Sequence, residues 1–343
     1  MSAPIRVLVV DDSAFARKVV REILTVPLTI EVVGSARDGE EALALTAALN
    51  PDVVVCDLRM PRLDGVGFVR RQMQLRPVPV LILSAAAQDA EEVVEALNAG
   101  AIDVVSKPSA LATDELRGVK DQLLAKVAAA SGAPVTNLLG ESVAKPVPLA
   151  PHESRVGIVC IGISTGGPQA LRRMMPVFPA NFAAPVAIAL HMPVGYTALY
   201  AEKLDEICDL EIKEAEDGDY LQPGRALLAP AGKHLTFRNT AKGTVVAHLG
   251  LHPIEKIHRP SVDVMFRSAA EVFGERVLAV VMTGMGDDGC EGAAWIKARG
   301  GSVLTEAEKS CVIYGMPRTV VEAGLSDASH SLDEMAQAIT SRL

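Results

Sequence analysis

The chain has 343 residues, of which 49% are hydrophobic and 3% aromatic, and its formal net charge is −9. This length exceeds that of one ordinary domain, so two compact units are expected. The acidic balance argues against a nucleic-acid partner, because a phosphate backbone binds to a basic surface. The five cysteines include no CxxC pair, so neither a disulfide framework nor a zinc site is indicated.

The N-terminus and the hydropathy pattern predict a protein of the cytoplasm. Residues 1–13 run into a strand-like segment, without the charged and long apolar regions of a secretory signal. No uncharged apolar run approaches the roughly 20 residues that a membrane helix needs. We therefore expect a soluble, cytoplasmic protein that is not integral to a membrane.

Residues 5–127 alternate five short apolar runs with five longer helical patterns. Strands are expected at 5–10, 30–36, 52–58, 79–85 and 101–108, and helices at 14–24, 39–49, 65–73, 89–100 and 114–127. This alternation is typical of a doubly wound α/β domain with a parallel sheet. We place that domain at residues 1–127.

Polar side chains follow the strands of this domain at their carboxyl ends, where open parallel sheets bind ligands. They are Asp11 and Asp12 after the first strand, Asp57 after the third, Ser84 after the fourth and Lys107 after the fifth. Three carboxylates held together need a cation, and an all-oxygen donor set suits Mg²⁺. The ammonium of Lys107 and the hydroxyl of Ser84 are suited to hold a phosphoryl oxygen.

This set of residues, with Pro108 and the segment MPRLDG at 60–65, resembles the receiver domain of bacterial response regulators. The resemblance implies a flavodoxin-like sheet and a histidine kinase as phosphodonor. It also implies that Asp57 is the phosphoacceptor and that Asp11, Asp12 and Asp57 are the Mg²⁺ ligands. Ser84 would be the switch hydroxyl, and Lys107 the phosphate-binding lysine.

Residues 128–154 are rich in Ala, Ser and Pro without a sustained period, which indicates a linker. Strand-like runs return at 156–164, 186–193, 225–232 and 277–284, and the first and last are followed by helical patterns. The pattern predicts a second α/β domain with a parallel sheet over residues 155–343.

The stretch GISTGGP at 162–168 is the first segment of the second domain with candidate functional residues. It satisfies the G-x-S-x-G pattern, in which Ser164 stands on a strand-to-helix turn and the N–H of Thr165 can face an oxyanion. It fails the dinucleotide-binding pattern G-x-G-x-x-G, because Ser164 occupies the second glycine position. A serine nucleophile is therefore favoured over a dinucleotide site.

A serine nucleophile needs a base and a group that orients the base. His191 ends the run at 186–190, and Asp288 follows the run at 277–284. We expect these residues to form a triad with Ser164, since geometry rather than chain order defines a triad. His330 in SDASH is the alternative base, on a polar stretch without a preceding strand. Ordinary polar contacts or loop positions are expected for His234, His258, His152 and His252.

Seven segments of the second domain follow one another in the order GISTGGP, HMP, KEAEDGD, LLAPAGKHL, RPSVD, MTGMGDDG and YGMPR. In these segments and their order, this half of the chain resembles the chemotaxis protein-glutamate methylesterases, the CheB family. The resemblance implies a hydrolase that demethylates glutamate methyl esters on methyl-accepting chemoreceptors and deamidates glutamines, with no cofactor for the esterase reaction. It makes Ser164 the nucleophile, His191 the general base and acid, and Asp288 the orienting carboxylate, with Thr165 and Met285 shaping the oxyanion site.

Two alternatives remain beside that function. One is a hydrolase of the same fold that acts on a substrate outside chemotaxis, and the other is a response regulator whose second half binds without catalysing. Three replacements of residues common in the family keep the substrate open, namely Leu190, Glu306 and Ala307.

Overall fold

The computed structural model describes residues 3–84, 89–107, 113–135 and 155–343. The contacts between residues divide the chain into two compact units, Met1–Gly140 and Glu141–Leu343. The boundaries at 127 and 155 stay predictions, because most of the expected linker lies outside the described residues. Helix α5 continues to Ala130, three residues into the segment that was expected to be linker.

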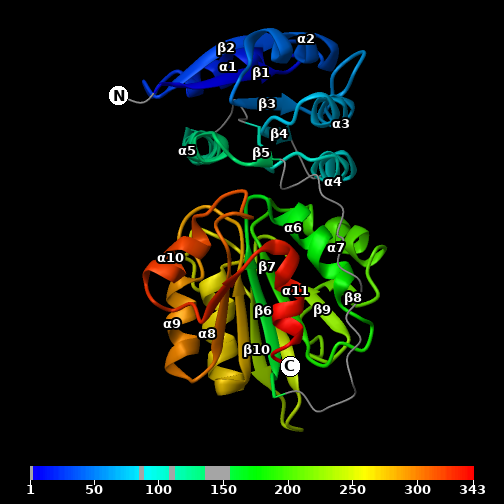
Figure 1. Cartoon of the computed structure of the whole chain (residues 1–343), viewed down its shortest axis with the longest axis vertical. Coiled ribbons are helices and arrows are strands. Elements are labelled where there is room, and N and C mark those ends of the chain that lie inside the picture. The colour runs from blue at the N-terminus through cyan, green and yellow to red at the C-terminus, as the bar shows by residue number, and fades with distance from the viewer. Residues whose placement is uncertain (1–2, 85–88, 108–112, 136–154) are drawn as a thin grey trace. The chain divides into compact units, whose positions relative to one another are not determined.

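The first unit contains a parallel sheet of five strands in the order β2-β1-β3-β4-β5, as expected for a doubly wound domain. Its elements are β1 (Ile5–Val10), α1 (Ala14–Leu24), β2 (Ile30–Ala36), α2 (Gly39–Leu49), β3 (Val53–Asp57), α3 (Gly65–Leu75), β4 (Val80–Ser84), α4 (Ala90–Asn98), β5 (Asp103–Ser106) and α5 (Thr113–Ala130). Helices α2, α3 and α4 pack side by side on one face of the sheet, and α1 packs with α5 on the other (Figure 1). The central strands are buried on both faces, which explains their continuous runs of Val, Leu and Ile.

The second unit contains a parallel sheet of seven strands in the order β14-β13-β12-β6-β7-β9-β8 and a separate hairpin, β10-β11. Its strands are β6 (Ile158–Ile163), β7 (Val186–Leu190), β8 (Glu211–Glu214), β9 (Arg225–Leu228), β10 (His234–Asn239), β11 (Val245–Gly250), β12 (Val277–Val281), β13 (Ser302–Glu306) and β14 (Ala328–His330). Its helices are α6 (Gly167–Met174), α7 (Thr197–Asp205), α8 (Val262–Phe273), α9 (Cys290–Ala298), α10 (Met316–Glu322) and α11 (Leu332–Thr340). Both units therefore have the predicted α/β class.

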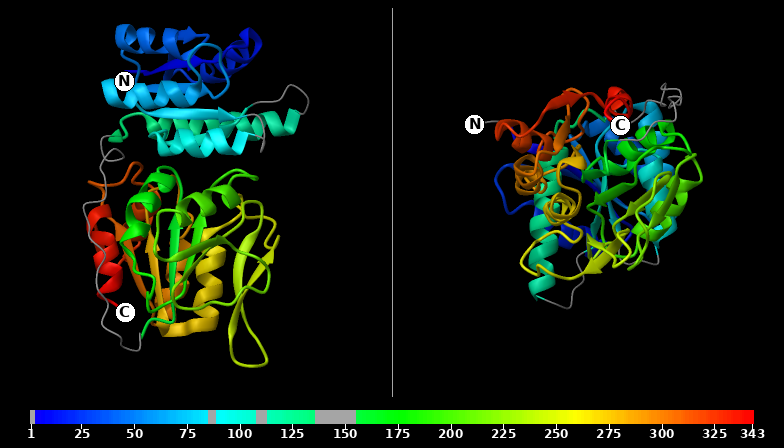
Figure 2. Two further views of the ribbon diagram at one scale, coloured as in Figure 1. Left: turned by 90° about the vertical axis from the view of Figure 1, so that its right-hand side faces the viewer. Right: turned by 90° about the horizontal axis from the view of Figure 1, so that it is seen from below.

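Helices cover both faces of the larger sheet. Helices α8, α9 and α10 lie on one face, and α6, α7 and α11 lie on the other (Figure 1). Figure 2 shows the β10-β11 hairpin, in yellow-green, beside α8. Helix α8 packs closely on β6, because a Cβ added to Gly162 would come within 2.2 Å of Val262 Cγ1. Glycine at this position lets the helix that follows the hairpin approach the central strand.

The order of connections places a topological switch point beside β6. The chain leaves β6 toward β7 on one side and leaves β12 toward β13 on the other, although β6 and β12 are neighbours. Ligands of open α/β sheets bind outside the carboxyl ends of such a strand pair. Ser164 follows β6, and the segment that carries Met285 and Asp288 follows β12.

Among the described residues of the second unit, the sequence analysis did not predict five strands, which are β8, β10, β11, β13 and β14. The edge strands β8 and β14 have the sequences EIKE and ASH, and His330 ends β14 rather than lying without a preceding strand. An edge strand is paired and covered less completely than a central one, so it lacks the apolar run that marks a central parallel strand. In the part of the chain that the structure describes, no helix is both long enough and apolar enough to span a membrane.

Candidate functional site

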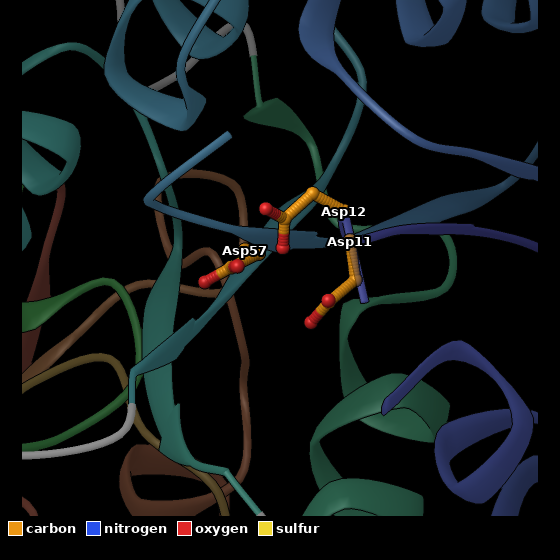
Figure 3. Close-up of side chains that lie close together, drawn as sticks. All are labelled: Asp11, Asp12 and Asp57. Carbon is orange, nitrogen blue, oxygen red and sulfur yellow. The ribbon is translucent and has the colours of Figure 1, made fainter. Parts of the chain in front are cut away.

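Three carboxylates gather at the carboxyl end of the smaller sheet. The ligand oxygens of Asp11, Asp12 and Asp57 lie within 4.8 Å of one another, at the ends of the neighbouring strands β1 and β3 (Figure 3). The ammonium of Lys107 lies 2.9 Å from Asp11 Oδ2 and 2.8 Å from Asp57 Oδ2. Gly65 allows the following helix to approach, because a Cβ there would lie 2.2 Å from the carbonyl oxygen of Asp57.

The charges of this pocket are incompletely balanced. Burial raises the pKa of Asp57, and the hydrogen bond and attraction from Lys107 offset only part of that rise. Burial would lower the pKa of Lys107, but its hydrogen bonds to Asp57 and Asp11 outweigh burial and raise it, so this lysine stays charged. One ammonium faces three carboxylates. An all-oxygen donor set with excess negative charge fits Mg²⁺.

Ser84 lies on the same edge of the sheet and uses its hydroxyl locally. Ser84 Oγ donates to Asp89 Oδ2 at 2.9 Å, and Asp89 Oδ1 lies 3.0 Å from the guanidinium of Arg59. This hydrogen bond directs the Ser84 hydroxyl toward Asp89. Pro108 lies outside the described residues.

Ser164 stands at the first residue after β6, on the turn into α6. The turn depends on Gly166, which has a φ of +81°, and is closed by a hydrogen bond from Gly167 N to Ser164 O at 2.7 Å. The backbone N–H of Ser164 donates to Thr283 O at 3.0 Å, which ties the turn to the end of β12. The serine side chain is thereby fixed at the switch point between β6 and β12.

His191 follows β7 and connects Ser164 with Asp288. Its Nδ1 lies 3.2 Å from Ser164 Oγ, and its Nε2 lies 2.8 Å from Asp288 Oδ2. Because the carboxylate of Asp288 accepts, Nε2 carries the proton of the neutral ring and Nδ1 is free to accept from the serine hydroxyl. Chymotrypsin-like proteases use the two ring nitrogens in the opposite order.

Asp288 is held at the N-terminus of α8. Its Oδ1 accepts the Ser261 hydroxyl at 2.9 Å and the Asp263 N–H at 3.0 Å, and its Oδ2 accepts the Val262 N–H at 2.7 Å. Burial would raise the pKa of Asp288, but the hydrogen bond and attraction from His191, with the N–H groups of Asp263 and Val262, outweigh burial and hold the pKa well below its usual range. The first turn of a helix also favours negative charge. Asp288 therefore remains a carboxylate.

Thr165 and Met285 lie on the two segments beside Ser164. Thr165 follows Ser164 directly, and its carbonyl accepts the Thr283 hydroxyl at 2.9 Å. Gly284, which precedes Met285, packs on Ser164, since a Cβ there would lie 2.7 Å from Ser164 Cβ. The structure brings both residues to the side of Ser164, and their roles stay predictions.

Three other histidines of the second unit differ in their surroundings, and His152 lies outside the described residues. His330 lies on the edge strand β14, where its backbone is in register with that of Glu306 on β13. Strands β13 and β12 separate β14 from β6. His234 makes the expected polar contacts, accepting from Ser261 N and contacting Pro253 O, each at 3.2 Å. His258 also stacks on His191, with ring centroids 4.1 Å apart. Sequence reasoning missed this stacking because the two residues lie far apart in the chain and no spacing links them.

Comparison with known proteins finds two family matches, one in each unit. Residues 159–339 match the CheB methylesterase family, and residues 7–117 match the response regulator receiver domain. The protein-glutamate methylesterase/protein-glutamine glutaminase 5 of Myxococcus xanthus is 49% identical, over 97% of this chain and 96% of its own length. A protein-glutamate methylesterase/protein-glutamine glutaminase of Halalkalibacterium halodurans is 41% identical, over 99% of this chain and 98% of its own length. The crystal structure of the Thermotoga maritima CheB methylesterase catalytic domain is 38% identical with a TM-score of 0.53, covering 55% of this chain and 99% of that one.

Proposed function

The chain belongs to the family of CheB methylesterases that carry a response regulator receiver domain, and we propose that it hydrolyses glutamate methyl esters on chemoreceptors in chemotaxis adaptation. The observation that carries this proposal is the hydrogen-bonded series Ser164, His191 and Asp288 beside the switch point of the larger sheet. The receptors are reached from the cytoplasm.

The first half of the reaction acylates Ser164. His191 Nδ1 takes the proton of the serine hydroxyl while Oγ forms a bond to the ester carbon of the methylated side chain. The imidazolium is stabilised by Asp288, whose lowered pKa keeps it ionised. The oxyanion is held by the backbone N–H groups of Thr165 and Met285, at the start of α6 and after β12. The bond to the methoxy group breaks, and methanol leaves with the proton from His191.

The second half releases the free carboxylate. Water takes the place of methanol and gives a proton to His191, and its oxygen attacks the acyl carbon. The bond to Ser164 then breaks, and the proton returns from His191 to the serine oxygen. A glutamine side chain follows the same course with ammonia as the leaving group, which accounts for the glutaminase activity in the names of the relatives.

The receiver supplies the regulation. Asp57 accepts a phosphoryl group from a histidine kinase, and Asp11, Asp12 and Asp57 would hold Mg²⁺, which would neutralise charge on the transferring group. Lys107 contacts the phosphoryl oxygens, and Ser84 moves from Asp89 toward them as the switch hydroxyl. Phosphorylation biases a two-state arrangement that controls access to Ser164.

Methanol release from membranes that contain methylated chemoreceptors tests the proposal. We expect the native protein to release methanol and Ser164→Ala to release it at least about 10³-fold more slowly, because the nucleophile is gone. Ser341→Ala, at an exposed position after α11, is the matched control and keeps the native rate. Equal release by Ser164→Ala would place the nucleophile elsewhere. Absence of release by the native protein, from membranes that a known methylesterase demethylates, would favour another substrate or a non-catalytic binding module.

A further inference from the structure

His258 lies on the loop between β11 and α8 and covers one face of His191. The two imidazole rings stack with their centroids 4.1 Å apart and an angle of 12° between their planes. Both ring nitrogens of His191 already form hydrogen bonds in the plane of the ring, to Ser164 and Asp288. The tilt of the His191 ring is therefore controlled by contacts with its face, such as the one from His258.

The loop that carries His258 is fixed on both sides of this residue. The carbonyl of Arg259 accepts the N–H of Gly232 at 2.8 Å. The buried ring of His234 accepts the N–H of Ser261 at 3.2 Å through Nδ1 and contacts the carbonyl of Pro253 at 3.2 Å through Nε2. Burial lowers the pKa of His234, so the ring is neutral and suited to accept at one nitrogen and donate at the other. His258 is thus carried on an anchored segment rather than on a free loop.

The same segment also holds the orienting carboxylate. Three residues after His258, the hydroxyl of Ser261 donates to Asp288 Oδ1 at 2.9 Å, and the next N–H, that of Val262, donates to Asp288 Oδ2 at 2.7 Å. One short stretch of chain therefore contacts the face of His191 and fixes the group that binds its edge. This continuity links the position of His258 to the geometry of the whole series.

We propose that His258 is a positioning residue for the general base, which holds the ring of His191 in the plane that contains Ser164 Oγ and Asp288 Oδ2. The inference rests on the proposed function only in that His191 acts as the base. Two hydrogen bonds at opposite edges of an imidazole leave it able to tilt about the line that joins them. A stacked ring resists that tilt, and proton transfer depends steeply on the angle and distance at the accepting nitrogen. The role requires an aromatic ring, not a titrating group.

The test compares His258→Ala with His258→Phe in the full-length protein, using two measurements. The first is kcat and KM for methanol release. The second is the rate at which a fluorophosphonate labels Ser164, which needs the base but no receptor. We expect His258→Ala to lower kcat and the labelling rate about tenfold with KM within twofold, and His258→Phe to remain within about threefold of the native protein in both. His252→Ala, at an exposed histidine of the same loop, is the control and keeps native rates.

The outcomes separate this inference from the proposed function. Native rates in His258→Ala, or a change confined to KM, would overturn the positioning role. Loss in His258→Phe as large as in His258→Ala would also overturn it, since a polar contact and not the ring would then matter. Thermal denaturation shows whether each variant is folded. If His258→Ala is not folded, the rates of His258→Phe decide whether an aromatic ring is sufficient for the positioning role. A labelling rate that depends on the ring, without release of methanol from any receptor, would keep the inference and remove the proposed substrate.

Discussion

Glu306 is the last residue of β13, and its side chain is fully buried. Its carboxyl accepts the N–H of Thr283 and the hydroxyl of Ser310, each at 2.9 Å. The carbonyl of Thr283 in turn accepts the N–H of Ser164, so the Glu306 carboxyl supports the turn that carries Ser164. Burial raises the pKa of Glu306 to about 7, and the hydrogen bonds offset only part of the rise. A buried carboxyl of this kind makes folding stability depend on pH.

We expect Glu306→Gln to remove that dependence. Between pH 4.5, the ordinary pKa, and about 7, the folded protein keeps a proton that the unfolded chain releases, so stability falls as pH rises. The full difference amounts to about 3 kcal/mol, from roughly 1.4 kcal/mol per pKa unit. An amide keeps the shape and an acceptor for Thr283 N–H without a buried charge. The stability of Glu306→Gln relative to the native protein should therefore increase from pH 4.5 to pH 8.

Denaturant unfolding at several pH values measures this difference. Glu308→Gln, two residues away and exposed, is the matched control and should follow the native protein at every pH. If Glu306→Gln and the native protein lose stability in parallel as pH rises, Glu306 does not hold a proton in the folded state.

At the scale of elements, the N-terminus of α8 serves the fold and the site together. Ser261 is the N-cap of this helix and accepts the N–H of Val264 at 3.4 Å. The same hydroxyl donates to Asp288 Oδ1 at 2.9 Å. The cap thus links the start of the helix to the carboxylate that contacts His191 Nε2.

We expect Ser261→Ala to lower both stability and kcat. Loss of an N-cap hydroxyl costs about 1 kcal/mol of stability. Loss of its hydrogen bond to Asp288 loosens the carboxylate, and kcat should fall about three- to tenfold with little change in KM. Ser331→Ala at the N-cap of α11 is the control, since that helix starts after the edge strand β14. It should lower stability with kcat unchanged. An equal loss of kcat in both variants would show that general destabilisation explains the effect.

The central strands of both sheets were predictable from the sequence. The central strands β1, β3, β6 and β12 are buried on both faces, so unbroken apolar runs mark them, and the residues after them fall at one edge of each sheet. That pattern predicts the strand-end positions of Asp57 and Ser164 from the sequence. It does not reveal β8 and β14, whose short polar sequences carry no run, nor the stacking of His258 on His191. Such contacts arise between loops brought together by tertiary packing, which no local period records.

At the scale of the whole molecule, the two sites follow one structural rule with different chemistry. Both lie at the carboxyl ends of parallel strands, one on each sheet. The first gathers the carboxylates of Asp11, Asp12 and Asp57, which call for a cation. The second pairs its donors and acceptors internally, from Ser164 through His191 to Asp288. The first site therefore depends on a bound cation for its charge balance, whereas the polar groups of the second satisfy one another.

We expect Asp57→Asn to retain the basal rate of methanol release and to lose its stimulation by acetyl phosphate, because the amide cannot accept a phosphoryl group.

Removal of Mg²⁺ with EDTA should have the same effect on the native protein, abolishing the stimulated increment and leaving the basal rate unchanged. Asp121→Asn, at an exposed position on α5, is the matched control and should be stimulated normally. Methanol release with and without acetyl phosphate, Mg²⁺ and EDTA measures all three. Stimulation of Asp57→Asn to the native level would show that another residue accepts the phosphoryl group, and a basal rate that falls with EDTA would show that a metal acts in the esterase half as well.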